Sequence, residues 1–299
     1  MSWPSPVPVP PSPCPASLAK AVLFGLAVLS VGTPARAQYD VPYVPTPQPV
    51  VDAMLEMAQI TGKDYLIDLG SGDGRIVVTA ARRFGTTGMG VDLNPVRIQE
   101  SKANAQAAGV TDKVEFRQQD LFQTDISKAT VLTMYLLPDV NLRLRPTILD
   151  KLQPGTRVVS HAFDMGDWEP DQTRTVDGKR IMGWVVPAKV QGVWRLDDGT
   201  GPRLLTLTQK YQRVTGRIGA EAGGTAAVGV GRLDGRRISL TLTGADGTAR
   251  DFDGEVEGDR MAGVTADGRR WTAERVEDGD HVSKAGSDMD EDTAADMGD

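Results

Sequence analysis

Cysteine and histidine are almost absent from this chain of 299 residues. Cys14 is the only cysteine, which excludes an intramolecular disulfide and a cysteine-rich zinc site. The two histidines, His161 and His281, are too few for a histidine-based metal cage, so no metal site is predicted. The formal net charge is −7, but nine acids and one lysine lie in residues 277–299. The rest of the chain is therefore close to neutral and lacks the basic surplus typical of nucleic-acid binding.

Long apolar runs are also scarce. The run near the N-terminus, residues 21–32, has 12 residues and is too short to span a bilayer. Lys20 precedes it, and an A-x-A pattern follows it at residues 35–37. This order predicts a signal peptide over residues 1–37, cleaved after Ala37, and an exported, periplasmic protein. An uncleaved, membrane-tethered form and a misassigned start site are the alternatives.

The remaining chain divides by composition. Residues 38–49 are rich in proline and tyrosine and predict an extended lead segment. Residues 50–187 alternate strand and helix patterns, which predicts an α/β domain with a parallel sheet and helices on both faces. Residues 188–276 are glycine-rich with short alternating runs and predict an antiparallel β meander or small barrel. Residues 277–299 predict a disordered acidic tail.

Apolar periodicity sets the expected elements of the α/β domain. Pro146 predicts a break or kink in the last helix. Ligands of such sheets bind at the carboxyl ends of the strands. Helices are expected over residues 50–60, 75–84, 95–109 and 141–152, and strands over residues 65–69, 88–93, 113–120, 129–137 and 155–163.

The first strand leads into a glycine-rich turn, in the sequence YLIDLGSGDGRIVV. Gly70, Gly72 and Gly74 stand at every second position, unlike the G-x-G-x-x-G spacing of a dinucleotide-binding turn. Asp68, just before the turn, would repel a pyrophosphate but suits a ligand that carries an ammonium group. The spacing and this acid therefore oppose a NAD-type oxidoreductase.

Two more acids end the next two strands. Asp92, 24 residues after Asp68, is placed to accept both hydroxyls of a ribose. Asp120 ends the third strand, within reach of an adenine amino group. S-adenosylmethionine combines an amino acid, a ribose and an adenine without phosphates, so the three acids together predict this cofactor.

Five blocks carry a family resemblance: VPYVPTPQPVVDAML, DLGSGDGRIV, LNP, LLPDVN and GTRVVSHAF…W. They resemble class I S-adenosylmethionine-dependent methyltransferases, and among these the lysine methyltransferases that modify the mitochondrial ATP synthase c-subunit and adenine nucleotide translocase, with their bacterial relatives. The resemblance covers about residues 43–168. It implies a Rossmann-like class I methyltransferase sheet with flanking helices, here followed by the small antiparallel β domain. It also implies a protein lysine as acceptor, with membrane proteins among the substrates.

The resemblance also implies roles for single residues. Tyr135 and His161 lie near the ends of the expected fourth and fifth strands and are the candidate catalytic residues, the first to orient an amine and the second to receive a proton. Cofactor binding is implied for Asp68, Gly70, Ser71, Gly72, Gly74, Asp92, Leu93, Asp120 and Leu121. Substrate binding is assigned to Tyr43, Pro45, Leu137, Pro138 and Trp168.

Other interpretations stay open. Tyr135 also fits core packing, His161 a structural histidine, and Trp168 a packing or lid residue. The chain has MYLLP where methyltransferases of planar amines have an NPPY-type motif, which leaves a small-molecule acceptor as an alternative. A non-catalytic exported protein that binds a nucleoside or peptide is another, because export separates the chain from cytoplasmic S-adenosylmethionine. The retained acids at the three strand ends favour the enzyme.

Overall fold

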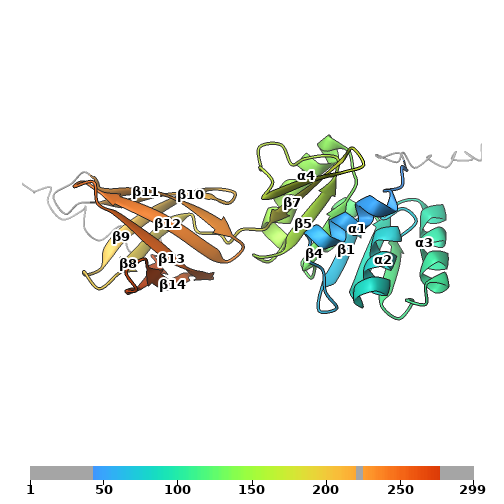
Figure 1. Ribbon diagram of the computed structural model, residues 1–299, viewed down its shortest axis with the longest axis horizontal. Helices are drawn as coiled ribbons and strands as arrows, with labels where there is room; N and C mark the ends of the chain where they lie inside the picture. The colour runs from blue at the N-terminus through green and yellow to red at the C-terminus, as the bar shows by residue number, and fades with distance from the viewer. Residues whose placement is uncertain (1–42, 220–224, 277–299) are drawn as a thin grey trace, which may run out of the picture. The chain divides into compact units, whose positions relative to one another are not determined.

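The computed structural model describes residues 43–219 and 225–276 (Figure 1). The predicted signal peptide, residues 1–37, and the predicted acidic tail, residues 277–299, lie outside the described residues. Among the residues described, no helix has the length and apolar character needed to cross a membrane.

A seven-stranded sheet forms the first domain, in the order β3-β2-β1-β4-β5-β7-β6. The first five strands in this order run parallel, as predicted, while β7 pairs antiparallel with both β5 and β6. The antiparallel pair was not predicted, because β6 is polar and its side chains are largely exposed. The bounds are β1 (Tyr65–Leu69), β2 (Thr87–Asp92), β3 (Val114–Gln118), β4 (Val131–Met134), β5 (Arg157–His161), β6 (Gln172–Val176) and β7 (Lys179–Val185).

Helices cover both faces of this sheet, as the alternating pattern predicts. They are α1 (Gln48–Met57), α2 (Arg75–Phe84), α3 (Pro95–Ala107) and α4 (Pro138–Lys151). One buried cluster joins the first three helices to the sheet, through Val50, Met54, Ile76, Ile98, Leu66 and Val131. The other cluster joins α4 to the opposite face, through Val140, Leu144, Ile148, Ile67 and Leu132.

Of the break or kink predicted at Pro146, the break does not occur, since α4 continues through this residue. A proline within a helix frees the carbonyl group of the residue four positions earlier, here Leu142. Both Pro146 and Leu142 lie on the exposed side of α4, where water can satisfy that carbonyl. The opposite side of the helix is buried through Leu144 and Ile148, which hold it on the sheet.

The strand order reverses between β1 and β4. The chain leaves β1 toward β2 on one side and leaves β4 toward β5 on the other, so the two connections diverge at the carboxyl ends. Open α/β sheets bind their ligands in the crevice at such a switch point. The fold class predicted from the sequence is confirmed, and it directs attention to the loops after β1, β2 and β4.

The second domain is a closed eight-stranded antiparallel barrel. Each strand pairs with the next along the chain, and β15 closes the barrel on β8. Large apolar side chains such as Trp194, Leu207, Leu240 and Trp271 form its buried core. The strands are β8 (Gly192–Asp197), β9 (Arg203–Lys210), β10 (Arg213–Gly219), β11 (Thr225–Asp234), β12 (Arg237–Gly244), β13 (Ala249–Glu257), β14 (Arg260–Thr265) and β15 (Arg270–Arg275).

Two glycines allow β13 and β14 to approach closely. Gly254 and Gly263 are direct partners in this strand pair. A Cβ atom on Gly263 would lie 1.9 Å from the carbonyl oxygen of Asp253, and one on Gly254 would lie 2.5 Å from that of Ala262. A larger side chain at either position would therefore push the two backbones apart.

We expect Gly263→Ala to lower the free energy of unfolding of the barrel by about 1–3 kcal/mol, because the added methyl group overlaps backbone that cannot move freely. Urea unfolding followed by tryptophan fluorescence measures this loss. Gly219→Ala is the matched control, since a Cβ atom there meets none of the described residues within 4 Å. Equal unfolding midpoints for the two variants would contradict the packing argument.

Candidate functional site

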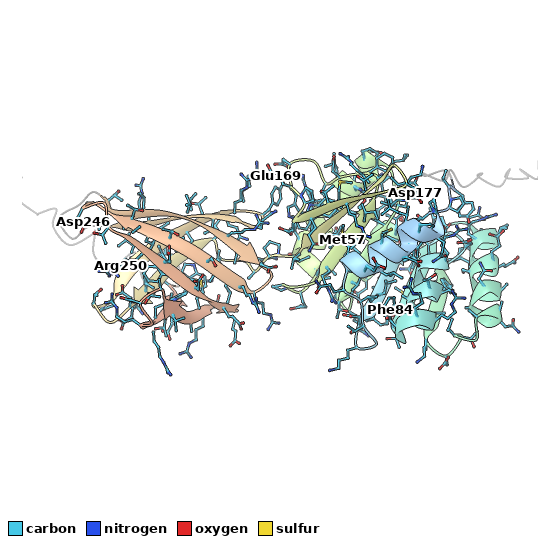
Figure 2. All side chains as sticks on the ribbon, viewed as in Figure 1. Met57, Phe84, Glu169, Asp177, Asp246 and Arg250 are labelled. Atoms are coloured by element: carbon cyan, nitrogen blue, oxygen red, sulfur yellow. The ribbon has the colours of Figure 1, made fainter. Side chains whose placement is uncertain are left out.

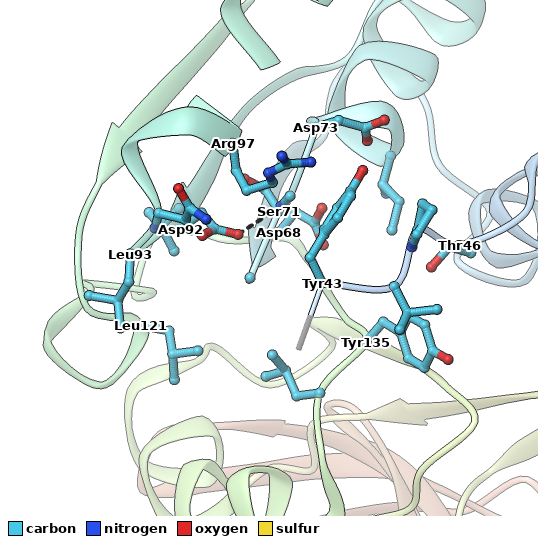
Figure 3. Close-up of a pocket in the computed structure, with 18 of the residues that line it drawn as sticks. Tyr43, Thr46, Asp68, Ser71, Asp73, Asp92, Leu93, Arg97, Leu121 and Tyr135 are labelled. Carbon is cyan, nitrogen blue, oxygen red and sulfur yellow. Dashed lines mark hydrogen bonds between the residues drawn. The ribbon is translucent and has the colours of Figure 1, made fainter. Parts of the chain in front are cut away.

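A cavity of about 610 Å³ lies at the carboxyl ends of β1, β2 and β4 (Figure 3). Its volume falls within the range of roughly 300–1,000 Å³ that is common for small-molecule sites. Of the residues predicted for the site, it is lined by Tyr43, Pro45, Asp68, Gly70, Ser71, Gly72, Asp92, Leu93, Asp120, Leu121, Tyr135 and Leu137.

The glycine-rich turn gives the cavity its backbone wall. Gly70 and Gly72 have φ angles of 74° and 54°, in the left-handed region that favours glycine. A Cβ atom on Gly70 would lie 2.8 Å from Leu136, and one on Gly72 would lie 2.5 Å from the ring of Tyr43. The turn thus needs glycine both for its conformation and for the side chains that lie against it.

Gly74 has a different role from the one predicted. It is the N-cap of α2 with a φ of 75°, and it does not line the cavity. A Cβ atom there would lie 2.6 Å from the ring of Phe116 on β3. Its small size therefore lets α2 begin close to the sheet, which positions the turn without contact to the cavity.

Two of the predicted acids organise the loops that carry them. Asp92, at the end of β2, accepts hydrogen bonds from the backbone N–H groups of Gly72 (3.0 Å) and Asn94 (2.8 Å). Asp120 accepts one from the N–H of Phe122 (2.9 Å), at the start of a short 3₁₀ helix. Both carboxylates line the cavity, so they hold their loops and face the ligand space together.

Asp68 is nearly inaccessible, with 2% of its surface exposed. The hydroxyl of Thr133 on β4 donates a hydrogen bond of 2.8 Å to its carboxylate. Burial raises the pKa of Asp68 to about 7, although the bond from Thr133 opposes the shift; the nearby charges of Asp92 and Asp73 raise it further. A ligand cation next to Asp68 would stabilise its ionised form.

The lead segment before α1 forms another wall of the cavity. Arg75 of α2 donates a hydrogen bond of 2.9 Å to the backbone carbonyl of Thr46, and the Thr46 hydroxyl lies 3.1 Å from Nδ1 of His161. The guanidinium of Arg97 lies 4.3 Å from the centroid of the Tyr43 ring. The segment whose closure over the site the resemblance implies thus lines the cavity.

Several cavity residues were not predicted from the sequence. Asp73 lies in the glycine-rich turn and forms an ion pair of 2.6 Å with Arg75. Burial raises the pKa of Asp73, but the hydrogen bonds and charge of Arg75 outweigh this and keep that pKa below its usual range. Arg97 and Phe163 also line the cavity. Of these residues, only Asp73 and Arg75 could have been predicted from the sequence, because both lie in the glycine-rich segment GSGDGR.

Tyr135 and His161 have different positions relative to the cavity. The Tyr135 ring lines it, 3.9 Å from the centroid of the His161 ring and 6.2 Å from that of Phe163. His161 is fully buried and does not line the cavity. Burial lowers its pKa to about 4, and the charge of Lys179 adds to the shift, so the ring is neutral near pH 7.

The predicted proton-accepting role of His161 is therefore corrected. A buried ring that contacts Tyr135 and Thr46 cannot touch an acceptor in the cavity. His161 is a positioning residue, because it contacts both Thr46 of the lead segment and Tyr135, the residue that follows β4.

Pro138 and Trp168 are also corrected. Pro138 is the first residue of α4 and lies outside the cavity lining, because its ring starts the helix. Trp168 is fully buried, with its ring centroid 5.9 Å from that of Trp184. Its carbonyl accepts a hydrogen bond of 2.8 Å from Nε1 of Trp184. Trp168 therefore packs in the core and contacts no substrate.

Comparison with known proteins decides the family. A model of the ANTKMT methyltransferase domain matches residues 68–172. A protein-lysine N-methyltransferase from Saccharolobus islandicus is 47% identical over 138 residues, which cover 46% of this chain and 86% of that protein. The chain belongs to this methyltransferase family.

Two further proteins are similar to the methyltransferase domain. The human lysine N-methyltransferase of the ATP synthase c-subunit is 31% identical over 139 residues, which cover 46% of this chain and 59% of that protein. The crystal structure of an RNA methyltransferase from Salinibacter ruber in complex with S-adenosyl-L-homocysteine is 54% identical, covers 49% of this chain and 96% of that one, and gives a TM-score of 0.49.

The cofactor of the methyltransferase domain is S-adenosylmethionine, which supplies an activated methyl group when bound. The cavity residues fit it. The three acids line the cavity, where Asp68 suits the amino group, Asp92 the ribose hydroxyls and Asp120 the adenine amino group. The hydroxyl of Ser71 is buried at the cavity and has no hydrogen-bond partner among the described residues, so a polar ligand group would satisfy it.

The raised pKa of Asp68 predicts a pH-dependent stability. Because the folded protein holds this proton more tightly than the unfolded chain does, the stability from Asp68 is greatest below its ordinary pKa of 3.8 and is lost as the pH rises through about 7. We expect the wild type to lose about 2 kcal/mol more free energy of unfolding than Asp68→Asn between about pH 5 and pH 8. Urea unfolding without ligand at both pH values measures the difference.

Asp112→Asn is the control, since Asp112 lies exposed in the loop before β3 and should follow the wild type. Parallel pH profiles for the wild type and Asp68→Asn would show that the Asp68 carboxyl titrates normally.

Proposed function

We propose that the methyltransferase domain transfers methyl groups from S-adenosylmethionine to the side-chain amine of a lysine in a protein. The observation that carries the proposal is the two-sided cavity. Figure 3 places Asp92, Leu93 and Leu121 on one side of it and Tyr135 with Thr46 on the other. The first side contains the groups that suit the cofactor, which leaves the second for the acceptor.

The acceptor side suits a neutral amine on an aliphatic chain. A lysine ammonium, with a usual pKa of about 10.4, must lose its proton before its nitrogen can accept a methyl group. Val44, Pro45 and Phe163 line the cavity together with Tyr135 and provide an apolar wall. Such surroundings disfavour the charged form of an amine and lower its pKa, while the lysine methylene groups gain apolar contacts.

Tyr135 is the residue best placed to orient the amine, because its ring lines the cavity and its hydroxyl can donate or accept a hydrogen bond. Its ring packs beside the rings of His161 and Phe163. Since His161 is neutral near pH 7, it adds no positive charge beside an incoming ammonium group. The aromatic pair therefore fixes Tyr135 without opposing the acceptor.

The relatives support a protein acceptor. The archaeal protein is named as a protein-lysine N-methyltransferase. A mouse protein that is 33% identical over 171 residues is named as an adenine nucleotide translocase lysine N-methyltransferase, and the human one is named for the ATP synthase c-subunit. By analogy, we include membrane proteins among the acceptors of this chain.

Methylation with a labelled donor tests the acceptor. Soluble and membrane protein fractions are incubated with the enzyme and methyl-labelled S-adenosylmethionine, and acid hydrolysates are analysed for labelled Nε-methyllysine. We expect Asp92→Ala to lower kcat/KM by at least about tenfold, because it removes a ribose acceptor and a bond that holds the glycine turn.

Asp112→Ala provides the matched control, in which an exposed acid away from the cavity is removed and activity should stay unchanged. Label that enters RNA or a small molecule, with none in lysine, would exclude the lysine proposal while leaving the methyltransferase activity established.

We also propose that the chain is exported and that its mature form begins at Gln38. The support is the order of Lys20, the apolar run of residues 21–32 and the A-x-A pattern of residues 35–37. Mass spectrometry of the N-terminal peptide, from protein recovered in the periplasmic fraction of the expressing cells, is expected to find Gln38 first. Recovery of the intact N-terminus from the cytoplasm alone would contradict export and would place the enzyme beside its cofactor supply.

A further inference from the structure

The barrel contains a second cavity, at one end. Because the strands run alternately up and down, the β8–β9 and β12–β13 connections lie at the same end of the barrel. A cavity of about 430 Å³ lies between them. Figure 2 shows Asp246 and Arg250, which both line it, at this end. The residues matched by the methyltransferase family model end at residue 172, before the barrel begins.

The inner wall of the cavity is apolar. Ile218, Leu242 and Phe252 line it, and each is at least 95% buried. Large side chains fill the rest of the barrel, but the residues toward the mouth are small, which leaves space for the cavity. These small residues are Ala226, Ala227, Gly244 and Ala245. An apolar group of a ligand would therefore find a pocket that is already formed.

The cavity also carries two arginines. Both bind the carboxylate of Asp198, which is 3% exposed: the distances are 2.6 Å from Arg203 and 3.4 Å from Arg250. The other oxygen of Asp198 accepts hydrogen bonds from the N–H and the hydroxyl of Thr200. One buried carboxylate thus faces two guanidinium groups, so this cluster of three side chains carries a net positive charge.

One buried donor group of this cluster has no partner among the described residues. Nε of Arg203 is buried and has no hydrogen-bond partner among the described residues, and Arg203 lines the cavity. A buried N–H group without a partner costs free energy, which a ligand oxygen would recover. The other acid at the mouth, Asp246, accepts a hydrogen bond from the N–H of Thr248 within its own turn and is exposed, so water screens its charge.

We propose that the barrel binds a small amphipathic carboxylate, with its apolar part against Ile218, Leu242 and Phe252 and its carboxylate on Arg203 and Arg250. Guanidinium groups bind carboxylates through paired, charge-assisted hydrogen bonds. Eight-stranded barrels have an interior of the size that holds one small ligand, and their mouths are common binding sites. This site is separate from the methyltransferase cavity and does not depend on the lysine proposal.

Calorimetric titration of the chain from Gln38 onward with decanoate tests the site. We expect saturable binding of one decanoate per chain and much weaker binding of decyltrimethylammonium, which has the same tail but the opposite charge. Arg250→Gln should weaken decanoate binding at least about tenfold, because it removes one guanidinium while Arg203 still pairs with Asp198.

Two further variants complete the design. Ala227→Leu places a larger side chain in the cavity and should abolish binding, whereas Arg217→Gln, an exposed arginine of β10 outside the lining, should leave it unchanged. Circular dichroism and S-adenosylmethionine binding confirm that each variant is folded. The proposal is overturned if decanoate does not bind the folded wild type, or if decanoate and decyltrimethylammonium bind equally well. It is also overturned if Arg250→Gln or Ala227→Leu binds decanoate as the wild type does.

Discussion

The hydrogen bond from the backbone of Gly72 to the carboxylate of Asp92 is the contact on which the site depends. It joins the turn after β1 to the end of β2, and it requires a glycine with positive φ so that the N–H can point toward the acid. Asp68 and Asp120 line the same cavity as this turn. A ligand therefore meets a preformed set of acceptors and does not have to order the loops itself.

The cofactor half of the site was predictable, because every part of it is local in sequence. Asp68, Asp92 and Asp120 each end a strand, and parallel strands in an open sheet bring their carboxyl ends to one edge. A strand pattern followed by an acid is then enough to place the side chain. The barrel was predictable for a similar reason, since short alternating runs joined by glycine turns pair with their neighbours along the chain.

The acceptor half was predicted less well, because it depends on contacts between segments far apart in the chain. His161 and Trp168 lie within a few positions of the cavity residue Phe163 in sequence, but both side chains are buried in the core. A residue after a strand can face the cavity or pack behind it, and the loop conformation decides between the two. The spacing of apolar residues in the sequence does not predict that conformation. The antiparallel strands β6 and β7 were not predicted. Because β6 lies at the sheet edge and its side chains are polar and exposed, its sequence lacks the apolar pattern of a strand.

The lead segment has a consequence for the maturation of the protein. Its first described residue, Tyr43, contacts the glycine turn, and Thr46 is bonded to α2 and to His161. The predicted cleavage after Ala37 leaves only five residues before Tyr43. A protease that trimmed slightly further would remove part of the cavity wall and leave the sheet intact. If the chain is cleaved as predicted, the accuracy of that cleavage would therefore decide whether the cavity keeps this wall.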